Sequence, residues 1–103
     1  MKQIIIYWRD IPAQVIVQRG RTREKVQLSH RFQEAIDRAA MRAGKGSSDA
    51  YMSEWRRVSS AIESEDGLRD IAEQEAQRLE AGINDEQLLQ LIRNHGSASQ
   101  ETQ

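Results

Sequence analysis

Histidine and carboxylate side chains could supply catalysis or metal binding, but none of them has the spacing that this chemistry requires. His30 and His95 are the only histidines, and they occur without an H-x-x-x-H or E-x-x-H pattern. We therefore expect them to be exposed or to lie at helix ends. Glu34 and Asp37 are spaced as neighbours on one helix face, where pairing with arginine accounts for them better than acid–base catalysis does.

Glycines and cysteines also give no sign of a cofactor. Gly44 and Gly46 flank Lys45, but the GxxxxGK[ST] pattern is absent, and these glycines follow a predicted helix, whereas those of a phosphate loop precede one. The absence of cysteine excludes disulfides, thiolate nucleophiles and cysteine-ligated metals. We expect no catalytic residue, no metal and no cofactor.

Aromatic and arginine side chains form the one combination that indicates a function, which is binding to another protein. Tyr7 and Trp8 are neighbours and Tyr51 and Trp55 are four residues apart, so one ring of each pair can enter a core while the other stays partly exposed. An exposed tryptophan beside arginines is typical of a binding hot spot. The candidate contact residues are Trp8, Arg9, Asp10, Arg19, Arg21, Arg23, Trp55, Arg56 and Arg57.

Charge is divided unevenly along the chain, although the net charge is only −1. Lys and Arg exceed Asp and Glu by 6 in residues 1–60, and the acids exceed the bases by 7 in residues 61–103. This division fits a basic binding surface, or two halves that attract each other on folding. The pI of about 6.1 and the absence of a matching motif argue against nucleic acid. We expect the basic segment to contact an acidic protein surface or the chain's own acidic half.

The pattern of apolar residues predicts one small α+β domain over residues 1–96. Branched and aromatic residues predict strands at 3–8 and 13–17, paired as an antiparallel hairpin, each strand with one buried face. Because of Pro12, the second strand is expected to start no earlier than Ala13. The basic segment 18–27 is interpreted as a turn or exposed loop.

Helical periodicity dominates the rest of the chain. A helix is predicted over 30–43, with Ser29 as its N-cap and Gly44 at its end. A short helix to about residue 56 follows, and residues 56–62 fit either a third strand or a continued helix. We favour extended chain there, which would widen the hairpin to three strands. Beyond an acidic break at 64–67, two helices ending near Gly82 and Gly96 form an αα-hairpin, so that the C-terminal half is α-helical. Residues 97–103 are predicted to be a disordered tail.

The first apolar run, at residues 4–8, is too short to cross a membrane. It is not followed by the small-residue cleavage site that a signal peptide requires. We therefore expect a cytoplasmic protein without membrane contact. The oligomeric state is not indicated by any pattern in the sequence.

Three segments resemble the family of short bacterial proteins known as virulence factor domains: YWRDIPAQVIV at 7–17, RFQEAIDRAAMRAG at 31–44 and DAYMSEWRR at 49–57. The resemblance covers roughly residues 3–95. It implies no established activity, cofactor or catalytic residue. Genes of such proteins lie near genes for folate-linked and corrinoid-dependent methyl transfer, which implies an accessory role in one-carbon metabolism. The D-x-H-x-x-G arrangement that ligates cobalt is absent from this chain.

The sequence thus favours a non-catalytic adaptor that binds another protein. The alternative is a small-molecule-binding or catalytic component of methyl-group metabolism, which rests on the resemblance alone. A ligand-sized pocket with converging polar groups would favour the alternative, and an exposed apolar surface with arginines would favour the adaptor.

Overall fold

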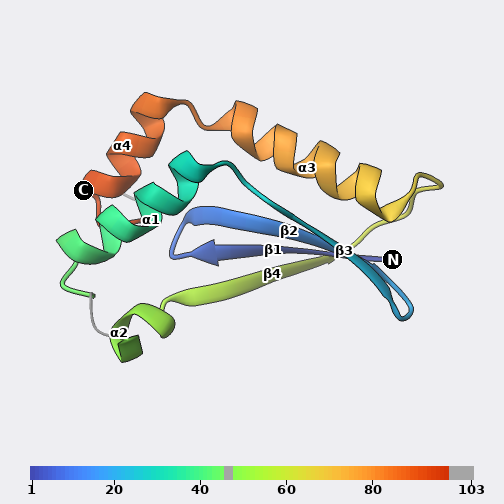
Figure 1. The fold of residues 1–103 in the computed structure, drawn as a ribbon, viewed down its shortest axis with the longest axis horizontal. Coiled ribbons are helices and arrows are strands. Elements are labelled where there is room, and N and C mark those ends of the chain that lie inside the picture. The colour runs from blue at the N-terminus through green and yellow to red at the C-terminus, as the bar shows by residue number, and fades with distance from the viewer. Residues whose placement is uncertain (46–47, 98–103) are drawn as a thin grey trace.

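The computed structural model describes residues 1–45 and 48–97, which form a four-stranded antiparallel sheet with helices packed against it (Figure 1). The strand order is β3-β2-β1-β4. The α+β fold class is confirmed, with strands mostly in the N-terminal half and helices mostly in the C-terminal half. The elements are β1 (Lys2–Trp8), β2 (Ile11–Arg19), β3 (Thr22–Gln27), α1 (His30–Arg42), α2 (Ser48–Met52), β4 (Trp55–Ala61), α3 (Leu68–Gly82) and α4 (Asp85–Arg93).

The predicted hairpin of β1 and β2 is present, and its two strands are the inner strands of the sheet. The register shifts between Ile6 and Tyr7, so that Tyr7 lies opposite Pro12. The expectation that the second strand begins no earlier than Ala13 is wrong, because β2 begins at Ile11. Pro12 is tolerated there since the irregularity interrupts the ladder, and the missing N–H costs no regular bond.

The outer strand β3 was not predicted, and for the outer strand β4 the favoured interpretation of extended chain after residue 56 was correct. Segment 18–27, interpreted as a turn or loop, continues β2 to Arg19 and then forms β3. The helix after residue 48 ends at Met52 rather than near residue 56, and the ambiguous segment 56–62 is strand β4 up to Ala61. Each edge strand pairs along its full length with an inner strand, and this pairing stabilises polar sequences that have little strand character of their own.

The core lies mainly between the sheet and α3, which packs across β2 and β3, and it continues to α1, which packs on α4 and on β2. Ile5, Val15 and Val17 face α3 from the inner strands. The expectation of one buried face per strand is wrong for β1, because Ile4 on the opposite face is also buried. Inner strands are flanked on both sides, so neighbouring side chains shield both of their faces.

The helix ends partly follow the prediction. Gly44 follows α1 with a φ of 72°, as a C-terminal glycine does, whereas Ser29 makes no side-chain cap bond to α1. Its hydroxyl donates instead to the Glu80 carboxylate of α3. Helices α3 and α4 are present where predicted, but the expected αα-hairpin is wrong, because α3 packs on β2 and β3 whereas α4 packs on α1. The expected tail, apart from Ser97, and Gly46 lie outside the described residues.

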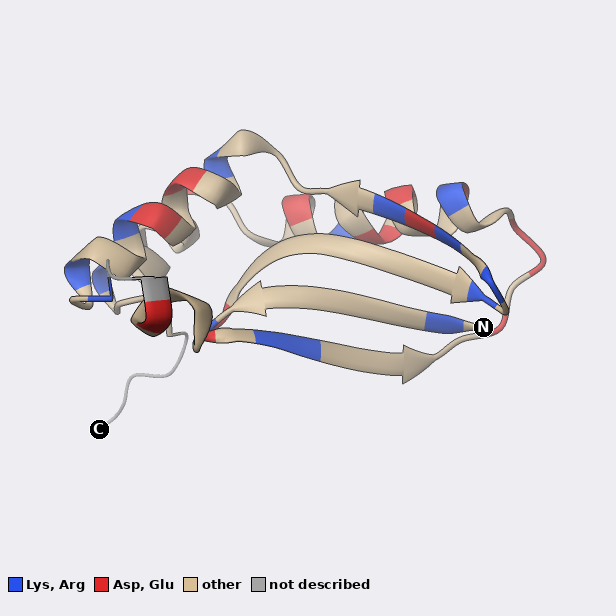
Figure 2. Cartoon of the chain, turned by 60° about the horizontal axis from the view of Figure 1, so that its bottom comes forward, with Lys and Arg blue, Asp and Glu red and all other residues tan. Residues whose placement is uncertain are grey.

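The sheet face opposite α3, here called the open face, is turned toward the reader in Figure 2. Helices α1 and α2 lie at one end of this face, and no helix of the described chain crosses the middle of β1, β2 or β4. The charged side chains of the open face are exposed, whereas Ile4 and Ile16 on the same face are buried, with 1% and 4% of their surface accessible.

Candidate protein-interaction surface

The turn between β1 and β2 is fixed by a network of arginines. Arg9 has a φ of 53°, and its guanidinium donates to the Glu54 carboxylate (3.1 Å) and to the carbonyl of His95 (2.9 Å). Arg56 donates to the carbonyl of Arg9 (2.7 Å) and to the carboxylate of Asp10 (2.9 Å). Arg9 thus connects this turn to Glu54, just before β4, and to His95, just after α4. Arg56 of β4 is bound to the turn itself.

Glu54 is the acidic centre of this network. Its carboxylate accepts from Arg9 and lies 3.5 Å from the ammonium group of Lys45. The hydrogen bond from Arg9, together with the positive charges of Arg9 and Lys45, holds the pKa of the Glu54 carboxyl below its ordinary value against an opposing effect of burial. The carboxylate therefore acts as a structural counter-charge and does not resemble a general base, whose pKa lies near neutrality.

The two tryptophans have different roles. Trp8 is fully buried, with its indole N–H donating to the carbonyl of Tyr51 (2.9 Å) and its ring stacked on that of Tyr51. Its ring is therefore closed to a partner. Trp55 is half-buried and lines a cavity of about 360 Å³ at the α1 end of the open face. The other residues around this cavity are Ala13, Gln14, Gln27, Leu28, His30 and Gln33.

The strand registers place three rows of side chains on the open face. The row at the far end from Trp55 contains Arg23, Gln18, Lys2 and Ala61. The middle row contains Lys25, Ile16, Ile4 and Ser59, and the row nearest the cavity contains Gln27, Gln14, Ile6 and Arg57. Four cations thus border three isoleucines, of which Ile4 and Ile16 are buried and Ile6 is partly exposed, and no acidic residue stands in any of the rows.

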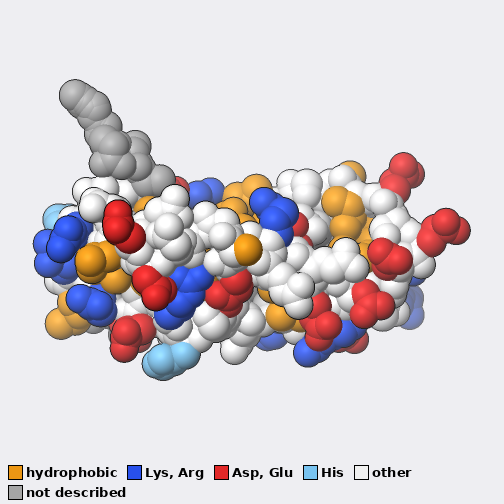
Figure 3. Space-filling view, turned by 90° about the horizontal axis from the view of Figure 1, so that it is seen from above, with side chains coloured by type: hydrophobic (Ala, Val, Ile, Leu, Met, Phe, Trp, Pro, Cys, Tyr) orange, Lys and Arg blue, Asp and Glu red, His pale blue; other side chains and the backbone are white. Residues whose placement is uncertain are grey.

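The four cations of the open face, Lys2, Arg23, Lys25 and Arg57, are all exposed and make no ion pair with a described residue. The cations on the α3 side differ. Arg69 pairs with Glu24 and Glu73, and Arg78 pairs with Glu75. On the surface seen in Figure 3, acidic side chains gather mainly over the α3 half of the molecule. The opposite charges of the two halves of the sequence are therefore only partly neutralised by each other.

The candidate residues from the sequence thus fall into three places. Trp55, Arg57 and Arg23 lie on the open face. Arg19 and Arg21 lie at the turn between β2 and β3, where Arg19 donates to the carbonyl of Ser64 (3.2 Å). Trp8, Arg9, Asp10 and Arg56 form the fixed network at the other end of the sheet. Lys2, Lys25 and Gln14 of the open face were not among the predicted contact residues, because only the strand register places them on this face.

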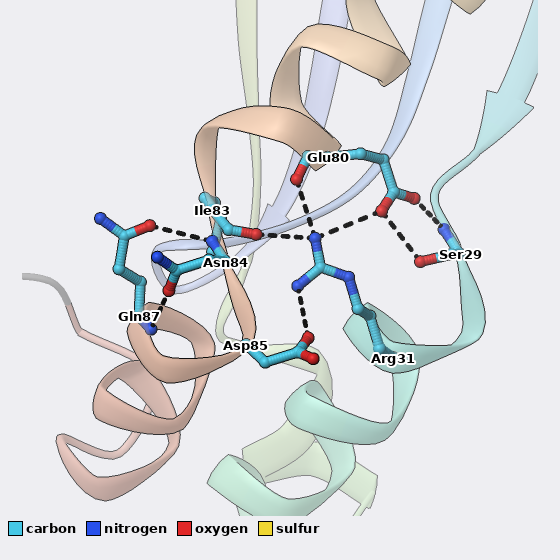
Figure 4. Close-up of polar contacts among 7 residues, drawn as sticks. All are labelled: Ser29, Arg31, Glu80, Ile83, Asn84, Asp85 and Gln87. Atoms are coloured by element: carbon cyan, nitrogen blue, oxygen red, sulfur yellow. Dashed lines mark hydrogen bonds and ion pairs between the residues drawn. The ribbon is translucent and has the colours of Figure 1, made fainter.

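A second polar cluster connects α1 to the junction of α3 and α4 (Figure 4). Arg31 donates to the carbonyls of Glu80 (2.8 Å) and Ile83 (2.6 Å) and to the carboxylate of Asp85 (3.1 Å). Beyond the turn, Asn84 and Gln87 form a reciprocal capping box at the start of α4. Arg31 therefore satisfies carbonyls at the end of α3, and the cluster has a structural role.

No group of three or more His, Asp or Glu side chains in residues 1–45 and 48–97 is arranged to hold a metal ion. His30 lines the cavity near Trp55, and His95 has a φ of 60°. None of the helices in these ranges has the length and apolar character needed to cross a bilayer.

The model of one protein family, described as Virulence factor, matches residues 6–92. The chain belongs to the virulence factor family. The match covers β1 from Ile6 through most of α4, and so includes the Arg31 cluster and the open face apart from Lys2 and Ile4. No curated protein and no solved structure matches the chain. The family description states no reaction, ligand or partner. The function is therefore inferred from the arrangement of the side chains in the structure.

Proposed function

We propose that this protein is a non-catalytic adaptor that binds an acidic segment of another protein on its open face. The observation that carries the proposal is the set of four exposed cations that surround the partly exposed Ile6 and have no acidic neighbour in the same rows. Apolar contacts supply affinity, and unpaired surface charge supplies attraction and selectivity toward acidic partners.

The cavity beside Trp55 supports the same proposal. It lies at the end of the open face, next to the row that contains Arg57 and Gln14. Buried aromatic rings and pockets are typical anchor points of protein interfaces. An apolar side chain of the bound segment fits this cavity, while acidic side chains of the segment reach the cations along the strands.

Binding of a small molecule in the cavity near Trp55 is the second candidate function. Its volume of about 360 Å³ is at the lower end of the range for ligand sites, and amide groups and one imidazole converge on it. Among the described residues, His30 is the one titratable side chain that lines the cavity, and the other polar groups there are amides, so this candidate is a binding role. The setting in methyl-group metabolism remains a proposal from the resemblance, and no contact in the structure bears on it.

A selection of 12-residue peptides from a random display library tests the adaptor proposal. We expect the selected peptides to combine aspartate or glutamate with apolar residues, and their affinity to fall as salt rises, since exposed charge attraction is screened over about 10 Å at 0.1 M ionic strength. A library that yields no binder, or binders without acidic residues, would contradict the proposal.

Matched charge variants then locate the binding surface. The test variant replaces three cations of the open face with glutamine: Lys2→Gln, Lys25→Gln and Arg57→Gln. The control variant replaces three exposed, unpaired arginines of α1 and α4: Arg38→Gln, Arg42→Gln and Arg93→Gln. We expect the selected peptide to lose affinity for the test variant only. Arg19→Gln, Arg21→Gln and Arg23→Gln together should have a smaller effect, because only Arg23 belongs to the rows of the open face.

A further inference from the structure

The outer edge of β4 has backbone groups without partners in the described chain. The ladder between β1 and β4 runs from Lys2–Ala61 to Trp8–Trp55 without a shift in register. At its ends, the Arg9 N–H donates to the carbonyl of Glu54, and the Ile62 N–H donates to the carbonyl of Met1. Because backbone direction alternates along a strand, the even-numbered residues of β4 bond to β1. The N–H and C=O groups of the odd-numbered residues therefore point outward, at Trp55, Arg57, Ser59 and Ala61.

This edge carries two arginines, Arg56 and Arg57, but lacks the other features that usually prevent strands from pairing with other chains. It contains no proline, and its ladder contains no bulge. The β3 edge is different, because α3 packs beside it and Arg69 donates to the outward carbonyl of Lys25 (3.5 Å). Val58 of β4 is also one of the few large apolar side chains that are exposed, with 42% of its surface accessible.

We infer that β4 pairs with β4 of a second copy of this chain, antiparallel and about a two-fold axis at Val58. In this arrangement Val58 lies opposite Val58 of the second copy, Arg57 lies opposite Ser59, and Trp55 lies opposite Ala61. No arginine faces an arginine directly, so the register avoids direct contact between like charges and pairs each large side chain with a small one, except at Val58.

The two neighbouring registers fit less well. Moving the axis to Arg57 places two arginines directly opposite each other, which is destabilising. Moving it to Ser59 places Val58 opposite Ser60 and removes the contact between the two valines. The backbone agrees with the axis at Val58. The backbone N–H and C=O of Val58 bond to β1, so the two valines of the dimer form no backbone hydrogen bonds to each other. They are therefore a non-hydrogen-bonded pair, the type with the shorter Cα–Cα distance in an antiparallel ladder.

The dimer joins the two sheets into one sheet of eight strands. A two-fold axis perpendicular to the sheet keeps both copies of α3 on the same side, and α3 packs over β2 and β3 and leaves the β4 edge clear (Figure 1). The two open faces then form one continuous basic surface. This inference stands on the strand edge alone and holds whether or not an acidic segment binds to the open face.

Analytical ultracentrifugation over a range of concentrations tests the pairing. The wild-type chain is expected to shift from 11.8 kDa to twice that mass as its concentration rises. Val58→Lys places two cations opposite each other and should weaken the dimer at least about tenfold. Met41→Lys is the matched control, because it removes another exposed apolar side chain, on α1, and should leave the dimer unchanged.

Single cysteines determine the register, because the chain has no cysteine of its own. In the inferred dimer, only residue 58 brings its two Cα atoms within the 4.4–6.8 Å that a disulfide requires, at about 4.5 Å. Val58→Cys should therefore form a covalent dimer on mild oxidation, and Arg57→Cys, Ser59→Cys and Ser60→Cys should not. A chain that stays monomeric at its highest soluble concentration, or that cross-links best at another position, would overturn the inference. Salt separates the two proposals, since it weakens capture of an acidic segment but not pairing of β4.

Discussion

Replacing Gly96 with alanine is expected to lower the free energy of unfolding by about 2–5 kcal/mol. Gly96 has a φ of 92°, and an added Cβ would lie 2.9 Å from Cζ3 and 3.2 Å from Cε3 of Trp8. The positive φ alone costs an alanine about 1–2 kcal/mol. Because the Trp8 ring is fully buried and held by its hydrogen bond to Tyr51, it cannot move freely, and overpacking adds about 1–3 kcal/mol.

Gly44→Ala is the control that separates the two costs. Gly44 also has a positive φ, 72°, but a Cβ at this position would meet no atom within 4 Å. This variant should therefore show only the backbone cost, about 1–2 kcal/mol. Urea unfolding followed by circular dichroism and tryptophan fluorescence measures both variants. Equal losses for the two would refute the reasoning, because they would show that the contact with Trp8 adds no cost.

Three further predictions concern packing and charge. Leu88→Ala removes a buried side chain from the contact between α4 and the core, and should cost about 2–5 kcal/mol in urea unfolding. Arg31→Lys loses the fork that binds two carbonyls and a carboxylate at the end of α3, and should cost about 1–3 kcal/mol by the same assay, whereas an unchanged value would remove its structural role. The lowered pKa of the Glu54 carboxyl adds stability above its unfolded value of about 4.3, and this is lost as pH falls through the lower folded value. Melting temperatures of Glu54→Gln should thus fall less steeply with acid, and parallel curves would count against the ion pair with Arg9.

The inner hairpin and the helices could be predicted because their apolar residues have to be buried wherever the rest of the chain lies. The run from Ile4 to Trp8 and the periodicity of α1, α3 and α4 indicate buried surface locally. Strands β3 and β4 could not be predicted in this way. Their sequences, TREKVQ and WRRVSSA, are mostly exposed, and their strand conformation comes from hydrogen bonds to β2 and β1. Such pairing is tertiary and leaves no periodic pattern.

The interaction surface was predictable in residue type but not in arrangement. Tryptophan and arginine indicated protein binding, yet Trp8 is enclosed in the core and Arg9 and Arg56 are fixed by carboxylates and carbonyls. The cations of the open face come from β1, β3 and β4, and their meeting depends on the register of each pair of strands. The irregularity between Ile6 and Tyr7 changes the register of β1 and β2, and no local pattern in the sequence predicts it.

The separation of acidic side chains over α3 from basic ones on the open face makes the molecule an electric dipole (Figures 2 and 3). In the field of a negatively charged partner, such a dipole experiences a torque that turns its positive side inward before any atoms touch. Encounters then begin from a narrower set of orientations, which raises the association rate constant without strengthening a single contact. Reversing the sign of a few residues on α3 would slow this approach although the binding surface itself stayed intact.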